Sequence, residues 1–238
     1  MAESVFRFKK FSIKQSDYVM KVGTDGVLLG AFADFSKADT VLDIGTGTGL
    51  IALMAAQKNP QAKIYALEKE TSAFDLASEN IKNSPFSKRI FPVHDDFKSH
   101  SEKSPRQYCH IVCNPPFYKN GLLPQSEALR TAKHIAELEY LDLIAGVKKI
   151  LKKNACFSVI IPAEHRSGFT AICLRKALYL QRRLTVFPTP GKAPKRMLLT
   201  FGLEKTEPEE NKLVIETGGR HSYSPEYKRL TKDFYLNF

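Results

Sequence analysis

Short apolar runs alternate with amphipathic segments from residue 39 onward. Five runs rich in Val, Ile, Leu and Phe predict buried strands, at 40–45, 63–68, 89–96, 109–116 and 156–162. Segments with helical patterns lie between or after them, at 50–59, 71–83, 136–153 and 167–178. Strands that are apolar along their length and separated by helices indicate a parallel sheet covered on both faces. We therefore expect an α/β, doubly wound fold.

The N-terminal part has a different pattern. Residues 5–15 alternate apolar and polar side chains, which predicts a half-buried strand or a hairpin. Gly23 and Gly26 then flank a tight turn, and the apolar residues after Asp25 predict a short helix with Thr24 or Asp25 as its N-cap. These residues form a small N-terminal extension to the sheet.

The last third of the chain changes character again. Segments 179–188, 196–205 and 211–217 are short strands divided by turn residues, as in an antiparallel edge. At 238 residues the chain has the length of one well-buried α/β domain with small additions. We expect one domain over 1–238, with an N-terminal extension (1–38), a core (39–205) and an edge strand with a tail (206–238).

The charge points to a polyanionic partner. The chain has 36 basic and 25 acidic residues, a formal net charge of +11. The excess is uneven, because no acid occurs between His165 and Leu203 while eight Lys and Arg residues do. A basic field of this kind attracts nucleic acid and speeds the encounter. A solvated basic face without a partner is the alternative.

No apolar run is long enough to cross a bilayer, and the N-terminal segment lacks the apolar centre of a signal peptide. The four cysteines show no metal-ligand spacing, and three of them lie in apolar runs. We interpret them as buried free thiols in a reducing compartment. The expectation is a cytoplasmic protein without a metal, a membrane contact or an obligate protein partner.

The first predicted core strand ends in a glycine-rich loop. Gly45, Gly47 and Gly49 let the backbone turn sharply and approach a ligand closely. Their spacing departs from the Gly-x-Gly-x-x-Gly of dinucleotide enzymes, and Asp43 places negative charge where a pyrophosphate would lie. A cationic ligand fits better. Glu68, at the end of the next strand, is placed to accept both hydroxyls of a ribose.

An acidic pair follows the third strand. The carboxylate of Asp96, or of its neighbour Asp95, can accept from an adenine amino group while Phe97 packs near the ring. We favour Asp96 because an apolar residue follows it directly. A helix N-cap or a plain loop acid is the alternative interpretation.

The fourth strand ends in Asn114-Pro115-Pro116-Phe117. The prolines stiffen this loop and lack N–H donors, so the Pro115 carbonyl and the Asn114 side-chain oxygen can accept both hydrogens of an exocyclic amine. An amine held in this way directs its lone pair toward an electrophile, with no strong base required. Phe117 offers a stacking face for an extruded base, worth about 1–3 kcal/mol.

These elements, in the order DIGTGTG, Glu68, DDF and NPPF, resemble the class I methyltransferases that act on amino or amide nitrogens. The resemblance implies a mostly parallel, seven-stranded, Rossmann-like sheet with S-adenosylmethionine as cofactor. It also implies that the cofactor site is formed by Asp43, Gly45, Gly47, Gly49, Glu68 and Asp96.

Both chain ends narrow the resemblance. Segments 6–34 and 222–236 resemble the bacterial family that methylates N6 of the adenine next to the anticodon of a valine tRNA. This implies tRNA as partner, Asn114 to Phe117 as the catalytic loop, and Gly23, Thr24 and Asp25 as residues that close over the methionine end of the cofactor.

The RNA contacts are less specific. Either Phe117 or Tyr118 can stack on the base, because related adenine enzymes commonly carry Tyr as the fourth residue of the loop. Lys192, Lys195 and Arg196 belong to a basic turn, GKAPKR, that can bind phosphates, although such turns also occur without a function.

Other activities stay open. Guanine N2 in rRNA is the strongest rival, because NPPF also occurs in such enzymes, and a protein glutamine is the second. An RNA-binding module without catalysis and an NAD-dependent oxidoreductase fit the motifs less well. Histidine at position 110 is interpreted as a packed core residue, and Tyr223, Tyr227 and Tyr235 as packing residues of the tail.

Overall fold

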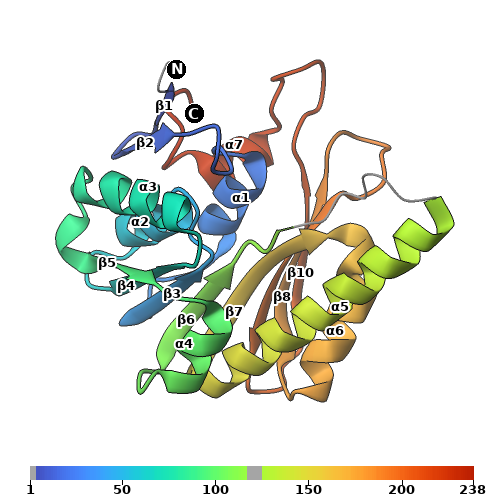
Figure 1. The fold of residues 1–238 in the computed structure, drawn as a ribbon. Helices are drawn as coiled ribbons and strands as arrows, with labels where there is room; N and C mark the ends of the chain where they lie inside the picture. Colours follow the sequence, from blue (N-terminus) through green and yellow to red (C-terminus); the bar gives the residue numbers. More distant parts are fainter. Residues whose placement is uncertain (1–3, 117–124) are drawn as a thin grey trace.

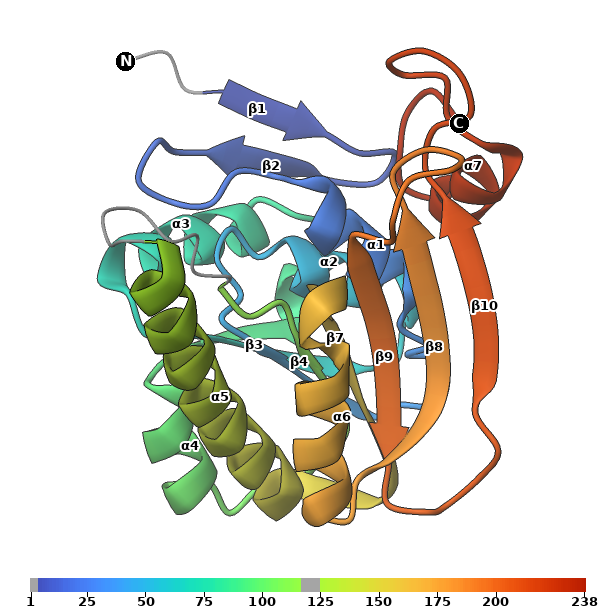
Figure 2. The same cartoon turned by 90° about the vertical axis from the view of Figure 1, so that its right-hand side faces the viewer.

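A mostly parallel sheet runs through the computed structural model, with helices on both faces (Figures 1 and 2). The structure describes residues 4–116 and 125–238, with the backbone alone over 125–137. Within these residues the sheet has eight strands, in the order β10 (Glu209–Val214), β8 (Tyr179–Phe187), β9 (Arg196–Gly202), β7 (Leu151–Pro162), β6 (Tyr108–Cys113), β3 (Thr40–Ile44), β4 (Lys63–Glu68) and β5 (Ile90–His94).

The expected α/β, mostly parallel fold is confirmed. The sheet contains the eight strands that the apolar pattern predicts, one more than the seven that the family resemblance implies. Only β9 runs against its neighbours, and the edge strand β10 pairs in parallel with β8. The connection after β9 passes the beginning of β8 before the chain turns back (Figure 2). The chain therefore adds β10 on the far side of β8, where its direction matches that of the core strands.

The helices divide into two layers (Figure 1). One face carries α1 (Thr24–Phe32), α2 (Leu50–Lys58), α3 (Thr71–Lys82) and α7 (Pro225–Thr231). The other face carries α4 (Phe97–Lys103), α5 (Gln125–Ile150) and α6 (Arg166–Arg175). The short helices α4 and α7 were not expected, and α5 begins earlier than the predicted residue 136. None of the described helices combines the length and the apolarity needed to cross a membrane.

The sequence left a single strand or a hairpin open for the N-terminal extension. The structure has the hairpin, formed by β1 (Ser4–Arg7) and β2 (Ser12–Gln15). Phe8, Phe11 and Ile13 are buried in the core, and one buried polar side chain of α3 adds hydrogen bonds. Asn80 of α3 accepts the N–H of Lys14 (2.8 Å) and donates to the carbonyls of Lys14 (3.1 Å) and Thr48 (2.9 Å). Because Thr48 belongs to the glycine-rich loop, Asn80 holds the hairpin, α3 and that loop together.

The turn of this hairpin packs on the C-terminal segment. The N–H of Lys9 donates to the carbonyl of Phe234 (2.9 Å). Tyr227 is buried, its ring stacks on Tyr223 with 5.0 Å between centroids, and its hydroxyl donates to that of Tyr235 (3.4 Å). The interpretation of the three C-terminal tyrosines as packing residues is confirmed.

The structure also confirms the packed core histidine. His110 on β6 is buried, and its Nε2 lies 2.9 Å from Ser158 Oγ, which contacts Thr200 Oγ1 at 2.9 Å. Burial lowers the pKa of His110 to about 4.

All four cysteines are free thiols, but only Cys113 and Cys173 are buried. Cys109 and Cys156 are half-buried, which corrects the expectation of burial, because they face a small hollow beside Lys152 at the amino-terminal part of the sheet.

Candidate active site

A cleft of about 1230 Å³ opens at the carboxyl edge of the sheet. The chain runs from β3 outward to β5 and then returns to place β6 on the other side of β3. Ligands bind at such a reversal of strand order in doubly wound sheets. The loops after β3 and β6, which carry the glycines and Asn114, meet there and line the cleft.

The three loop glycines adopt left-handed backbone angles. Their φ values are +65° at Gly45, +58° at Gly47 and +83° at Gly49. At Gly45 and Gly47 an added Cβ would meet nothing within 4 Å. The left-handed backbone conformation therefore requires glycine at these positions, since there is room for a side chain. The backbone of the loop borders open space. Gly49 lies behind the loop as the N-cap of α2.

Asp43 supports this loop from below. Its side chain is fully buried, and Oδ2 accepts the hydroxyl of Thr46 (2.6 Å) and the N–H of Ala52 (3.1 Å). Burial raises the pKa of Asp43 to about 7, and the nearby charge of Glu68 acts in the same direction. Oδ1 is buried without a partner among the described residues. Asp43 is absent from the cleft wall, so its direct task in the structure is to hold the loop on α2.

Glu68, at the end of β4, faces the cleft but is already engaged. Oε1 accepts the N–H groups of Lys69 (2.9 Å) and Glu70 (3.1 Å), and Oε2 accepts the N–H of Gly47 (3.0 Å). A carboxylate offers about four acceptor positions. One position on Oε2 is left for a ribose hydroxyl, and accepting both hydroxyls requires one backbone bond to open.

Asp96 has the capping role that the sequence offered as the alternative. Its Oδ1 accepts the N–H groups of Lys98 (2.9 Å) and Ser99 (3.4 Å) and begins α4. Asp95, Asp96 and Phe97 all line the cleft. The Phe97 ring packs on α5 where Gly146 has no side chain. Contact between Asp96 and an adenine amino group stays a prediction.

Asn114 lines the cleft and carries a buried acceptor. It follows β6 directly, and its Oδ1 is buried with no hydrogen-bond partner among the described residues. Pro115 and Pro116 line the same wall. Leaving a buried acceptor without a donor costs about 1–3 kcal/mol, so such an atom indicates a place for a ligand donor. The predicted stacking residues Phe117 and Tyr118 lie outside the described residues.

The start of α1 closes another side of the cleft. Gly23, Thr24 and Asp25 all line it, and the N-cap is Gly23, with no side-chain cap, instead of Thr24 or Asp25. Gly26 approaches α2 so closely that a Cβ would lie 2.9 Å from Leu50. The helix start is therefore seated directly on the helix that follows the glycine-rich loop.

The predicted phosphate-binding residues have different surroundings. Arg196 Nε pairs with Asp25 Oδ2 at 2.8 Å, which joins the start of β9 to the start of α1. Lys195 lines the cleft, and Lys192 is exposed on the same loop. Neither lysine has an ion pair within the described part of the chain. Arg196 therefore supports α1 and also lines the cleft, so its contact with RNA stays a prediction, as do those of the two lysines.

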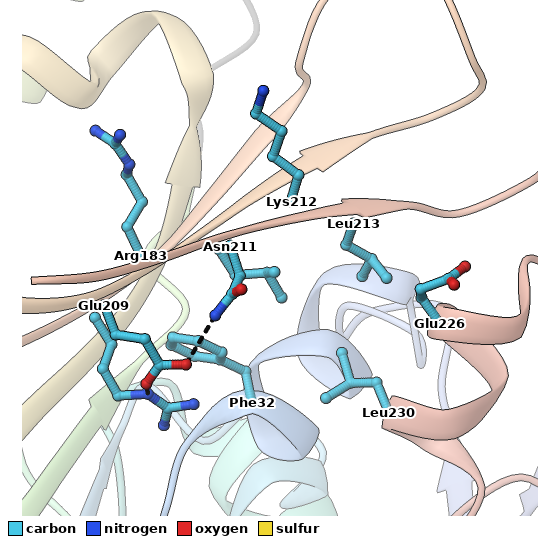
Figure 3. A pocket seen from close by; sticks show the side chains of 10 residues that line it. Phe32, Arg183, Glu209, Asn211, Lys212, Leu213, Glu226 and Leu230 are labelled. Carbon is cyan, nitrogen blue, oxygen red and sulfur yellow. Dashed lines mark hydrogen bonds and ion pairs between the residues drawn. The ribbon is translucent and has the colours of Figure 1, made fainter.

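The acid-free basic stretch is partly neutralised by β10. Arg182 pairs with Glu209 (3.2 Å), and Arg183 pairs with Glu210. Figure 3 shows a shallow hollow here, where Glu209 also accepts from Asn211 (2.8 Å) and the guanidinium of Arg182 lies 4.8 Å from the centre of the Phe32 ring. These contacts hold the edge strand in place.

Sequence reasoning missed several residues of the cleft wall. Tyr140 of α5 lines it, with its hydroxyl 2.9 Å from His165 Nδ1. Tyr18, between β2 and α1, is 79% exposed. Arg220 and His221 reach the cleft from the segment after β10. The local sequence does not indicate that these residues line a cleft, because Tyr140 lies in a helix, Tyr18 in a loop, and Arg220 and His221 in a glycine-rich turn.

Comparison with known proteins identifies relatives over the whole chain. The family described as methyltransferase small domain matches residues 11–138. The tRNA1(Val) (adenine(37)-N6)-methyltransferase of Bacteroides fragilis is 42% identical over 237 residues, covering 99% of each chain. The protein of the same name from Trichodesmium erythraeum is 39% identical over 240 residues and the full length of both chains.

Solved structures share the fold. A predicted O-methyltransferase from Agrobacterium tumefaciens superimposes with a TM-score of 0.69 at 19% identity, covering 88% of this chain and 96% of that one. The Thermus thermophilus 16S rRNA N2 G1207 methyltransferase, in complex with AdoMet and guanosine, has a TM-score of 0.59 at 16% identity and covers 86% and 50%. The class I methyltransferase fold is confirmed by these neighbours.

Proposed function

This chain belongs to the family of tRNA1(Val) (adenine(37)-N6)-methyltransferases, and from that premise we propose that it transfers a methyl group from S-adenosylmethionine to N6 of the adenine next to the anticodon of a valine tRNA. The unpartnered acceptor Asn114 Oδ1 is the observation that carries the choice of an amine as the methyl acceptor. The same premise makes Pro115, Pro116 and Phe117 the rest of the catalytic loop.

The cleft fits the proposed cofactor in shape and charge. S-adenosylmethionine supplies an electrophilic methyl group on a positively charged sulfur. Gly45 and Gly47 border open space that can receive the cofactor, and Glu68 has an acceptor position for a ribose hydroxyl. Asp43 supports the loop from beneath, and Gly23 and Thr24 bound the side proposed for the methionine end.

Asn114 and Pro115 orient the amine. Asn114 Oδ1 accepts one hydrogen of the adenine amine, and the carbonyl of Pro115 accepts the second. With both hydrogens held, the nitrogen lone pair points out of the ring plane toward the methyl group, which favours the geometry of the transition state. The amine becomes acidic once it has been methylated, so its proton passes to solvent without a strong base.

The basic residues at the cleft favour an RNA over a peptide as the substrate. Lys195 lines the cleft and Lys192 stands on the same loop, both without ion pairs among the described residues. A nucleotide in an anticodon loop can be extruded at a smaller cost than a base in a duplex. The formal charge of +11 supports steering toward such a polyanion.

Asn114→Ala tests the mechanism. We expect kcat for methyl transfer to valine tRNA to fall by about 10²–10³-fold, the usual cost of losing one positioned hydrogen bond to the reacting group. Affinity for S-adenosylmethionine, measured by calorimetry, should stay unchanged. Asn211→Ala, on the edge strand and outside the cleft, is the matched control.

Mass spectrometry of nucleosides from the treated tRNA identifies the product. N6-methyladenosine supports the proposed function. N2-methylguanosine, or full turnover by the Asn114→Ala variant, would contradict it.

A further inference from the structure

Residues 216–223 form a small hairpin between β10 and α7, which we call the C-terminal hairpin. Its two ends pair as an isolated bridge between Glu216 and Tyr223. Within it the N–H of Thr217 donates to the carbonyl of Ser222 (2.9 Å), and that of Ser222 donates to the carbonyl of Gly219 (3.0 Å). The hairpin rises beyond the sheet next to the β8–β9 loop (Figures 1 and 2).

The base of the C-terminal hairpin is fixed on two sides. The N–H of Glu216 donates to the carbonyl of Pro188 (3.0 Å), at the beginning of the β8–β9 loop. Tyr223 stacks on the buried Tyr227 of α7. The two loops therefore share one support, and the loop that carries Lys195 is tied to the hairpin.

The tip holds an unusual backbone. His221 has a φ of +70°, a left-handed conformation that costs a residue other than glycine about 1 kcal/mol or more. The Glu216 Oε1 atom accepts the N–H of His221 at 2.8 Å and stabilises it. Arg220 and His221 are both exposed and both line the cleft. The hairpin thus presents Arg220 and His221 at the cleft from a base that is held on two sides.

Arg220 has no carboxylate within ion-pair distance among residues 4–116 and 138–238. This distinguishes it from Arg182, Arg183 and Arg196, whose charges are paired with carboxylates. An exposed guanidinium beside a nucleic-acid cleft is suited to bidentate contact with a phosphate.

We propose that the C-terminal hairpin binds the phosphodiester backbone of the RNA beside the methylated nucleotide, with Arg220 as the phosphate contact and His221 beside it. This inference rests on the proposed function. The extruded base enters at Asn114, the flanking phosphates stay at the mouth of the cleft, and Arg220 and Lys195 hold them from two neighbouring loops. The hairpin acts on RNA affinity and leaves the cofactor site unaffected.

Arg220→Ala is the test, with Arg229→Ala as control. Arg229 is an exposed arginine of the same C-terminal segment, on α7 and outside the cleft wall. The probe is a fluorescein-labelled anticodon stem-loop of valine tRNA, with binding followed by anisotropy over a series of salt concentrations. We expect Arg220→Ala to weaken binding about tenfold or more. We also expect the slope of log K against log salt to fall by about 0.7–0.9.

Two further variants separate charge from backbone. Arg220→Lys should restore the salt slope while recovering only part of the affinity, because it keeps the charge and loses the bidentate geometry. His221→Gly keeps the left-handed backbone at no steric cost and should weaken RNA binding without lowering the melting temperature. The Kd for S-adenosylmethionine should match the wild type in all three variants, because the expected change is in RNA affinity.

Equal RNA affinity and salt slope for Arg220→Ala and Arg229→Ala would overturn the inference, as would a changed affinity for S-adenosylmethionine. The proposed function is tested separately, by analysing the product that the wild-type protein forms. If the wild type forms no N6-methyladenosine but Arg220→Ala still weakens RNA binding, the phosphate contact stands and the adenine assignment fails.

Discussion

Asp43→Asn should change the pH dependence of stability in the ligand-free protein. The Asp43 carboxyl is fully buried, with a pKa raised to about 7 from an ordinary 3.8. Between these two values the folded state holds a proton that the unfolded state has lost. Stability therefore falls as the pH rises, by about 1.4 kcal/mol per unit for this one group. Above pH 7 both states are ionised and the loss is complete, at about 4 kcal/mol.

The substitution isolates this effect. The amide oxygen can keep the bonds from Thr46 and Ala52, while the NH₂ group takes the place of the unpartnered Oδ1 at a pH-independent cost of about 1–3 kcal/mol. From pH 5 to pH 8 the wild type should lose about 2–3 kcal/mol relative to the variant. Asp39→Asn, at an exposed carboxylate just before the same strand, is the control substitution.

Urea unfolding measures the free energies of unfolding of wild type and variant. The transition is followed by far-UV circular dichroism, because the chain contains no tryptophan for a fluorescence signal. The decisive quantity is the change with pH of the difference in unfolding free energy between wild type and variant, and not the size of that difference at any one pH. A difference between wild type and Asp43→Asn that is constant from pH 5 to 8 would show that Asp43 titrates near its ordinary value, and would refute this account.

Two pairs of substitutions test the cleft. Gly47→Ala places a side chain in open space at φ +58°, so we expect it to lower the affinity for the cofactor and to reduce stability by about 1 kcal/mol. Gly168→Ala also places a side chain in open space, but within α6, and should be neutral or stabilising. Calorimetry compares the cofactor affinities of the two variants, and thermal melts compare their stabilities. Arg196→Ala removes the ion pair to Asp25 and should weaken binding of S-adenosylmethionine several-fold more than binding of RNA, while Lys195→Ala should do the reverse. Titrating each variant with S-adenosylmethionine and with RNA measures both affinities. If Arg196→Ala impaired only RNA binding, Arg196 would be assigned to the phosphates instead.

The core of the fold could be predicted from the sequence because its strands are buried on both faces. Such strands leave continuous apolar runs, as in β3 and β6. Strand β10 could be predicted only in part, at 211–217 and in an antiparallel edge, because most of its side chains are exposed. Its acids pair with Arg182 and Arg183 across the sheet edge. Helices α4 and α7 have seven residues each, too few for a periodic pattern to emerge.

The position of the site could also be predicted, because motifs at the ends of parallel strands must meet at one edge. The individual contacts could not. Whether Asp43 faces the cleft or supports the loop depends on a burial that only the packed α2 helix creates. Arg196 resembles its basic neighbours in sequence, and its pairing with Asp25 joins residues far apart in the chain. The C-terminal hairpin has the composition of any exposed turn.

The docking of the N-terminal hairpin on the C-terminal segment sets an order of events during folding. The N–H of Lys9 donates to the carbonyl of Phe234, so this contact closes a loop that contains most of the sheet. Asn80, which fixes β2 to the glycine-rich loop, closes a much shorter loop. Because the entropic cost of closing a loop grows with its length, the hairpin can dock on α3 before its turn meets the C-terminal segment. The wall of the cleft continues from this hairpin into α1, so the binding-competent cleft is completed only when the most distant contact has formed.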